Sequence, residues 1–512
     1  MEFIKKIGYH ICVTMEEILS PLPPRNTGAP TESAESIQSV QPTPSATQPI
    51  PSATPMVSTP IAATKKPFDI KKILPWLLIV VVAVILISIF FRIRKTGVKK
   101  LIKSATVELN YWGIWEESSV MEGLIADYQK KNPNIKINYK KNLQTDYRTR
   151  LKNRLAKTGT DQDDVPDIYR IHASWIPMFR EELEPVPLLT SNAMGLETDF
   201  FDVYKRDLKA KGTANFLAIP LMYDGLSLYY NKDLLTQAGV SVPKTWNELR
   251  AAAEKVLKRD KDGKIEIAGV AAGLVDNIDH WSDIVGLMLQ QSSIDPIKAV
   301  GSDDKKIGDV LTYYTLLKTK YNLWDDTLPN STQMFASGRL GFYFGPSWRV
   351  FNIEEMSGGK LNYEITTVPQ LELASGELTN IHWASYWVEG VNSKSANKKE
   401  AWKFLEYLAS KEGLEKSFTT ASQLRKFGQI YPRKSMSGAI VTNTKITPFV
   451  SAANNAYNWY LSSRTFDNGL NDEMMKYFGD AINGMALKGR GTDEVVVTLK
   501  SGISQLATKY KL

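Results

Sequence analysis

The chain has 512 residues, with 63 basic and 55 acidic side chains and a formal net charge of +8. Ten of the basic residues lie between Lys65 and Lys103 with a single acid, Asp69, so the remaining chain is almost neutral. The charge therefore gives no support for a nucleic-acid-binding protein. The only cysteine, Cys12, excludes an internal disulfide, so the large C-terminal part must rely on its hydrophobic core, which its length permits.

The first 72 residues form an arm with two parts. Residues 1–20 carry apolar side chains at helical spacing, which suits a short amphipathic helix on a membrane surface or against a partner. Residues 21–72 are rich in proline, threonine and serine and have too few large apolar residues to form a core. We therefore expect a disordered linker over 21–72.

An uncharged run, residues 73–91, follows the arm with the sequence ILPWLLIVVVAVILISIFF. As a helix it would be about 28 Å long, close to the hydrocarbon thickness of a bilayer. A cleaved signal peptide fits less well, because 72 residues precede the run and basic residues follow it where a small-residue cleavage site belongs. The run predicts a transmembrane helix, with the lipid bilayer as a partner.

From Ser104 onward, strand and helix patterns alternate, which predicts an α/β fold. Residues 107–114 and 135–139 have strand patterns on either side of a helical pattern at 120–131, and this is the start of a βαβ unit. Further along, Asn231 is placed to cap a short helix, and Thr245 with Glu248 predicts a capping box. Two more elements are expected, a helix at 147–157 and a strand at 167–171.

Five collinear segments resemble the family 1 extracellular solute-binding proteins, the maltose- and multiple-sugar-binding group of ABC importers. The most recognisable segment is FLAIPLMYDGLSLYYNKDLLTQAGVSVPKTWNELRAAAEKV. The others are LNYWGIWEESSVMEGLIADYQKKNPNIKI, VPDIYRIHASWIPMFREELEPV, FASGRLGFYFGPSWRVFNI and HWASYWVEGVNSKSANKKEAWKFLEYLASKEGLEK. Most relatives are released by a signal peptide or held by a lipidated cysteine after the apolar run, whereas no cysteine follows the run here.

The resemblance implies a two-lobed fold of the periplasmic-binding-protein type over residues 104–512, with hinge strands and a ligand cleft between the lobes. By this analogy lobe 1 takes about 104–220 and 378–430, and lobe 2 takes about 221–377 and 431–512. The implied function is capture of a carbohydrate, expected to be an oligosaccharide, and its delivery to the permease subunits of an ABC transporter, with no cofactor. An anchored sensor that signals through the arm is an alternative with the same cleft.

The flanking charges do not fix the orientation of the apolar run. Four basic residues precede it and six follow it, which would favour a cytoplasmic large domain by the positive-inside rule. Long domains can cross the membrane regardless of flanking charge, and the family is extracytoplasmic. We therefore expect an extracellular C-terminal domain and a cytoplasmic arm.

Ligand-binding residues are expected just after strands, where ligands bind in open α/β sheets. A sugar calls for aromatic platforms for its C–H faces and polar groups for its hydroxyls, although each tryptophan is also compatible with simple packing. The resemblance favours Asp224, Trp348 and the corner from Trp112 to Glu116. The full set of candidates is Trp112, Trp115, Glu116, Ser174, Trp175, Tyr223, Asp224, Trp348, Trp383, Tyr386 and Arg433, with His172 and Trp387 beside them in sequence.

An enzyme is the rival class, since Glu116 or Glu117 with Asp224 could form the carboxylate pair of a glycosidase. The four histidines show no metal-ligand spacing, and the sequence has no GxSxG or GxxxxGKS motif. We therefore expect a binding protein with no catalytic residue and no metal site. Trp246 and Trp402 lie on helical apolar patterns and are expected in the core.

Overall fold

The computed structural model describes residues 79–89, 106–157, 164–299 and 302–512. The chain divides into two units, Met1–Ser88 and Ile89–Leu512. Residues 79–89 are helical and their side chains are exposed, and the rest of the apolar run at 73–91 lies outside the described residues. The predicted amphipathic helix at 1–20 and the predicted linker at 21–72 also lie outside them. Among the residues that the structure describes, no helix has both the length and the apolar character needed to cross a membrane.

The first sheet contains five strands in the order β2-β1-β3-β11-β4. β1 is parallel to both β2 and β3, and β11 runs antiparallel between β3 and β4. The expected βαβ start is confirmed, with α2 connecting the first two strands. The strands are β1 (Val107–Ile114), β2 (Ile135–Asn142), β3 (Ile168–His172), β4 (Ile219–Pro220) and β11 (Trp387–Val391).

The second sheet also contains five strands, in the order β6-β7-β8-β5-β9. The predicted capping box at Thr245 and Glu248 starts α8, which packs on β7. A Cβ atom on Gly269 would lie 2.4 Å from the Ala253 carbonyl oxygen, so only glycine allows this close packing. The strands are β5 (Ser227–Asn231), β6 (Lys258–Arg259), β7 (Ile265–Val270), β8 (Leu340–Gly345) and β9 (Tyr363–Thr366).

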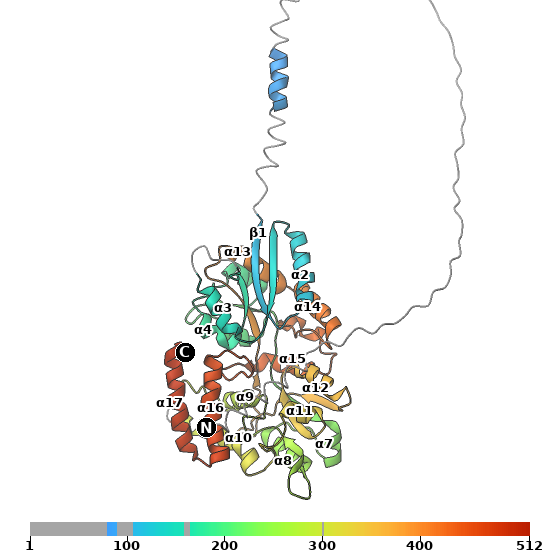
Figure 1. Ribbon diagram of the computed structural model, residues 1–512, viewed down its shortest axis with the longest axis vertical. Helices are drawn as coiled ribbons and strands as arrows, with labels where there is room; N and C mark the ends of the chain where they lie inside the picture. The colour runs from blue at the N-terminus through green and yellow to red at the C-terminus, as the bar shows by residue number, and fades with distance from the viewer. Residues whose placement is uncertain (1–78, 90–105, 158–163, 300–301) are drawn as a thin grey trace, which may run out of the picture. The chain divides into compact units, whose positions relative to one another are not determined.

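Helices surround each sheet and form two lobes, shown in Figure 1 with β1, α2, α13 and α14 in one and α7 to α12 in the other. We call them lobe 1 and lobe 2 after the first and second sheet. The longer helices are α2 (Ser118–Lys131), α3 (Tyr147–Leu155), α7 (Lys232–Ala238), α8 (Trp246–Val256), α9 (Trp281–Gln291), α10 (Ser302–Thr319), α12 (Arg349–Ser357), α13 (Lys398–Leu408), α14 (Lys411–Leu424), α16 (Leu470–Lys488) and α17 (Thr492–Tyr510). The shorter helical segments are η2 (Ala173–Trp175), α4 (Ile176–Phe179), α5 (Leu188–Met194), α6 (Asp202–Asp207), α11 (Ser331–Ala336), η3 (Lys434–Ala439), α15 (Thr447–Ala452) and η4 (Ala453–Asn455).

The chain crosses between the sheets several times. One crossing joins β4 to β5, and its Tyr223 pairs with Ile430 of a second crossing. A third joins β10 (His382–Trp383) to β11, and β10 pairs with β12 (Ala456–Tyr457). The expected two-lobed α/β architecture is confirmed, and Trp246 and Trp402 lie in the core as predicted.

Candidate functional site

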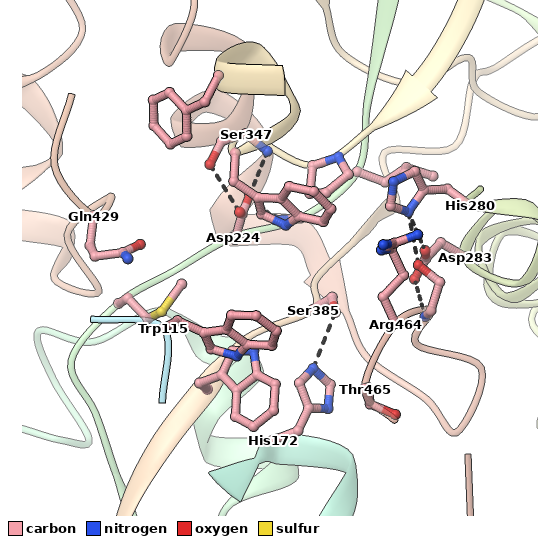
Figure 2. Close-up of a pocket in the computed structure, with 18 of the residues that line it drawn as sticks. Trp115, His172, Asp224, His280, Asp283, Ser347, Ser385, Gln429, Arg464 and Thr465 are labelled. Atoms are coloured by element: carbon pink, nitrogen blue, oxygen red, sulfur yellow. Dashed lines mark hydrogen bonds and ion pairs between the residues drawn. The ribbon is translucent and has the colours of Figure 1, made fainter. Parts of the chain in front are cut away.

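A cavity of about 310 Å³ is lined by residues of both lobes (Figure 2). Four of the predicted ligand-binding residues line it: Trp115, Asp224, Trp348 and Trp383. Trp115 follows β1, Asp224 lies between β4 and β5, Trp348 follows β8, and Trp383 belongs to β10. These positions are strand ends or crossings, as expected for a ligand site in an α/β fold.

Indole rings line the cavity from both lobes. The rings of Trp115 and Trp387 meet edge to face in lobe 1, with centroids 5.8 Å apart. Trp115 is 39 % exposed and has a φ of 72°, an unfavourable value for a bulky residue and one that is typical of strain at a ligand site. In lobe 2, the Arg349 guanidinium lies 4.5 Å from the ring centre of Trp348. Aromatic platforms of this kind suit the apolar faces of a sugar.

The carboxylate of Asp224 is buried and has three donors from the protein itself. Its Oδ1 accepts hydrogen bonds from the backbone N–H of Gly225 at 2.8 Å and of Ser347 at 3.0 Å. Its Oδ2 accepts the Ser347 hydroxyl at 2.9 Å. Burial raises the pKa of Asp224 to about 7, against the lowering effect of these hydrogen bonds. The side chain therefore joins the crossing between β4 and β5 to the turn that precedes α12 before any ligand arrives.

A second bonded group surrounds His280 at the other side of the cavity. Arg349 Nε donates to His280 Nε2 at 2.9 Å, so the ring proton is on Nδ1, which lies 2.8 Å from the Ser463 hydroxyl. Asp283 Oδ1 accepts the indole N–H of Trp383 at 2.8 Å and the backbone N–H of Ser463 at 3.1 Å. Burial lowers the pKa of His280, and the ring is neutral at pH 7.

His172 is a third buried polar group in the lining. Its Nδ1 accepts the backbone N–H of Ser174 at 3.3 Å, which leaves the proton on Nε2 facing the Ser385 hydroxyl at 3.1 Å. Burial lowers the pKa of His172 to about 3. Both histidines are therefore neutral hydrogen-bonding groups that connect chain segments, and Figure 2 shows His172 in the lower part of the view below Ser385 and His280 at the upper right beside Asp283.

Seven predicted residues lie outside the cavity lining, and four of them belong to the strands and turns of lobe 1. Trp112 lies within β1 and donates to Asp164 at 3.3 Å. Trp175 stacks on Phe179, because η2 turns its ring into the lobe. Ser174 bonds to the His172 ring at 2.7 Å. The carboxylate of Glu116 accepts long hydrogen bonds from the cavity residues Arg425 at 3.5 Å and Gln429 at 3.4 Å, so it supports the lining without joining it.

The other three of these residues stabilise the crossings. Tyr223 is buried against Phe201, with ring centroids 5.3 Å apart. Tyr386 donates to Asp207 at 2.7 Å, while its neighbour Trp387 lines the cavity, because successive strand residues point to opposite faces. Arg433 bonds to the Ala409 carbonyl at 2.8 Å and to Asp199 at 2.8 Å.

Sequence reasoning missed most of the polar lining. His280 and Asp283 lie at the start of α9, where a helical pattern predicts only packing. Two loops, 425–429 and 463–466, lie beyond the last segment of family resemblance and have no periodicity. The only local signal was composition, because both loops combine arginine with phenylalanine.

The arrangement offers no catalytic centre of the kinds considered above. Neither Glu116 nor Glu117 is in the cavity lining, so the carboxylate pair with Asp224 that a glycosidase would need is not assembled there. Within the described ranges, no group of histidine, cysteine, aspartate or glutamate could hold a metal ion. The site can bind and enclose a ligand through rings and hydrogen bonds.

Comparisons with known proteins agree with this geometry. The chain is 21% identical over 327 residues to the multiple sugar-binding protein of Streptococcus mutans, covering 62% of this chain and 74% of the relative. The solved sugar-binding protein MalE of Xanthomonas citri superposes with a TM-score of 0.62 at 17% identity, covering 79% and 98% of the two chains. A solute-binding protein of Thermotoga lettingae, solved with α-D-tagatose, superposes with a TM-score of 0.58 at 19% identity, covering 78% of this chain and 99% of that protein. These structural likenesses show the fold.

The family match spans residues 113–415, which is more than half of the chain, and the family is described as bacterial extracellular solute-binding protein. The expectation that the chain is a binding protein and not an enzyme is confirmed by this match. The chain belongs to the bacterial extracellular solute-binding proteins.

Proposed function

We propose that the protein captures a carbohydrate between its lobes and delivers it to the permease of an ABC importer. The observation that carries this proposal is the placement of indole rings from both lobes on one cavity, Trp115 and Trp387 from lobe 1 and Trp348 from lobe 2. Aromatic side chains at the wall of a cleft match the C–H faces of sugar rings. The names of the relatives, which are sugar-binding proteins, support the same ligand class.

Binding works by a shift between open and closed arrangements of the lobes. A ligand that touches both walls gains more contacts when the lobes approach, so it favours the closed form by its differential affinity. We take the moving bodies as about 104–220 with 378–430 and about 221–377 with 431–512. The permease would then recognise the closed form.

The proposal includes anchoring in the membrane through residues 73–91, with the binding domain outside and the arm in the cytoplasm. The support is the uncharged run itself, which is as long as a bilayer-spanning helix. Residues 92–106 separate the run from β1 and can span at most about 50 Å. Such a tether would keep the domain within reach of a permease in the same membrane and raise its effective concentration there.

Two measurements test the proposal. Isothermal titration of the full chain in nanodiscs with a panel of mono- and oligosaccharides should give saturable binding, and chromatography should recover each bound sugar unchanged. A chemically altered sugar would contradict the binding role. Protease added to intact cells should remove the C-terminal domain and spare the arm, and a protected domain would contradict the orientation.

A further inference from the structure

The carboxylates of the cavity are already bonded within the protein. Asp224 has three protein donors on its two oxygens. Asp283 accepts Trp383 and Ser463 on one oxygen, and its other oxygen lies 3.2 Å from the His280 ring. Sugar hydroxyls both donate and accept, and a free carboxylate is the strongest acceptor for their protons. Neither acid of this lining is free for that purpose.

Most groups that remain unpaired in the lining are donors. The indole N–H groups of Trp115, Trp348 and Trp387 have no hydrogen-bond partner among the described residues. Arg464 uses one nitrogen, Nη1, on Asp279 at 3.1 Å. Arg425 uses Nε on the Phe427 carbonyl at 3.1 Å and Nη2 on Glu116 at the long distance of 3.5 Å. The available acceptors are neutral amide and hydroxyl oxygens, those of Gln144, Gln429, Ser385 and Thr465.

Arg464 and Thr465 form the most incompletely paired corner of the cavity. The Thr465 hydroxyl is buried, with 2 % of the residue exposed, and has no hydrogen-bond partner in the part of the chain that the structure describes. Such a group destabilises the empty site until a ligand bonds to it. Figure 2 places Arg464 beside His280 and Asp283, across the cavity from Gln429.

The charges around Arg464 leave room for an anion. Asp279 is shared between two guanidinium groups, those of Arg349 at 3.0 Å and Arg464 at 3.1 Å. Burial and the neighbouring Arg349 both lower the pKa of Arg464. The remaining ionisable neighbours are His280, which is neutral, Tyr343, whose phenol stays protonated because burial raises its pKa, and Asp283, whose oxygens face His280, Trp383 and Ser463. A ligand anion at this corner would offset the repulsion between the two arginines.

We propose that the captured solute is a saccharide with an anionic substituent, a carboxylate, sulfate or phosphate, which binds at Arg464 and Thr465. The inference rests on the proposed carbohydrate-binding function and specifies its ligand class. The sugar rings lie against the indoles, and the acidic group accepts hydrogen bonds from the guanidinium and the hydroxyl. An acceptor-only group fits this corner because the corner offers donors and lacks a free carboxylate.

The test compares pairs of saccharides that differ only in charge. We would titrate the full chain in nanodiscs with trigalacturonate and its neutral trimethyl ester, with lactose sulfate and lactose, and with maltose phosphate and maltose. In at least one pair the acidic member should bind about ten- to a hundred-fold more tightly, the range for hydrogen bonds to a charged group. Its affinity should fall as salt rises from 0.15 to about 1 M.

Two variants locate the effect. Arg464→Gln should reduce the ratio of the two affinities within the discriminating pair towards one. Arg490, in the turn between α16 and α17, lies outside the cavity lining, so Arg490→Gln should leave the ratio unchanged. Thr465→Val should weaken the binding of the acidic saccharide and leave the binding of its neutral counterpart unchanged. It should not lower the melting temperature, because it removes an unpaired buried hydroxyl.

The outcomes separate the two proposals. Equal or tighter binding of neutral saccharides would overturn the anionic ligand class and leave carbohydrate capture intact. Discrimination that survives Arg464→Gln would overturn the placement at Arg464. Absence of binding to every saccharide, acidic or neutral, would overturn the proposed function and this inference with it.

Discussion

Two walls of the cavity differ in how completely they are bonded. The Asp224 wall, formed by Asp224, Gly225 and Ser347, pairs every oxygen of its carboxylate with a donor. The 463–468 loop instead has left-handed φ values at three non-glycine residues, Arg464 (59°), Phe466 (52°) and Asn468 (45°). It also contains the unpaired hydroxyl of Thr465. The first wall is built for stability, and the second holds strain and open hydrogen-bonding groups of the kind found at ligand sites.

The 463–468 loop is held from outside the cavity. Arg148 of α3, in lobe 1, donates to the carbonyl of Asp467 at 2.6 Å and to that of Asn468 at 2.8 Å. Asp467 is itself buried and accepts the backbone N–H of Gly469 at 2.9 Å and of Asn471 at 3.0 Å. These bonds fix the end of a loop whose middle faces the ligand. Variants in the two walls should therefore separate stability from affinity.

The largest effect is expected from Asp224→Ala. The change leaves two buried backbone N–H groups and one hydroxyl without their acceptor, and we expect a loss of about 3 kcal/mol in the free energy of unfolding. Urea denaturation measures it. Asp224→Asn keeps one acceptor oxygen and should lose less than half as much. Equal stability of the alanine variant and the wild type would show that the Asp224 wall does not stabilise the fold.

Trp348→Ala should act mainly on affinity. The ring is partly exposed at the start of α12, so its loss removes a stacking surface and should weaken saccharide binding by about 1–3 kcal/mol. Trp402→Ala is the matched control, since that ring is 3 % exposed in the core and its loss should lower stability by about 3–5 kcal/mol. Calorimetric titration and melting of both variants decide the point. Unchanged affinity in Trp348→Ala would remove Trp348 from the site.

Arg148→Ala should weaken ligand binding by about 1 kcal/mol although the side chain does not line the cavity. The reason is that the loop that presents Arg464 and Thr465 loses two hydrogen bonds. Arg154→Ala on the same helix is the control, since among the described residues Arg154 has a single ion pair, a 3.8 Å contact with Asp164. A double-mutant cycle with Arg464→Gln should give a coupling energy. Strict additivity would contradict an effect through the loop.

The smallest expected effect is a pH dependence from Asp224. Its pKa is about 7 in the folded state, above the usual value near 4, because burial disfavours the charged form. The folded state therefore binds more protons than the unfolded state between about pH 4 and 7, and stability falls as pH rises through that window. The buried Asp207, with a pKa of about 7, contributes with the same sign. The stability difference between wild type and Asp224→Asn should decline from pH 4.5 to 7.5, and a constant difference would contradict the raised pKa.

Local patterns predicted much of the fold. The first strand at 107–114 and the capping box of α8 follow from side-chain alternation and from two residues three positions apart. The resemblance supplied the two lobes, which no local pattern contains. The path of the chain between the sheets depends on long-range pairs such as Tyr223 with Ile430, and single-sequence reasoning has no access to them.

The site was harder to predict than the fold. Trp115 and Trp348 follow strands and line the cavity. Trp112 lies within β1, before the strand ends, and packs within lobe 1. Tyr386 and Trp387 are neighbours in sequence and point to opposite faces. The 463–468 loop could not be predicted, because its position depends on Arg148, more than three hundred residues away in the chain.

The central claim is that a saccharide closes the two lobes around itself. The most direct test is an electron-spin distance measurement between labels on Lys130→Cys of α2 and Lys255→Cys of α8, in a Cys12→Ser background that leaves no other cysteine. Addition of a saccharide that binds in calorimetry should shift the distance distribution to shorter and narrower values. An unchanged distribution at saturating saccharide would contradict capture by lobe closure.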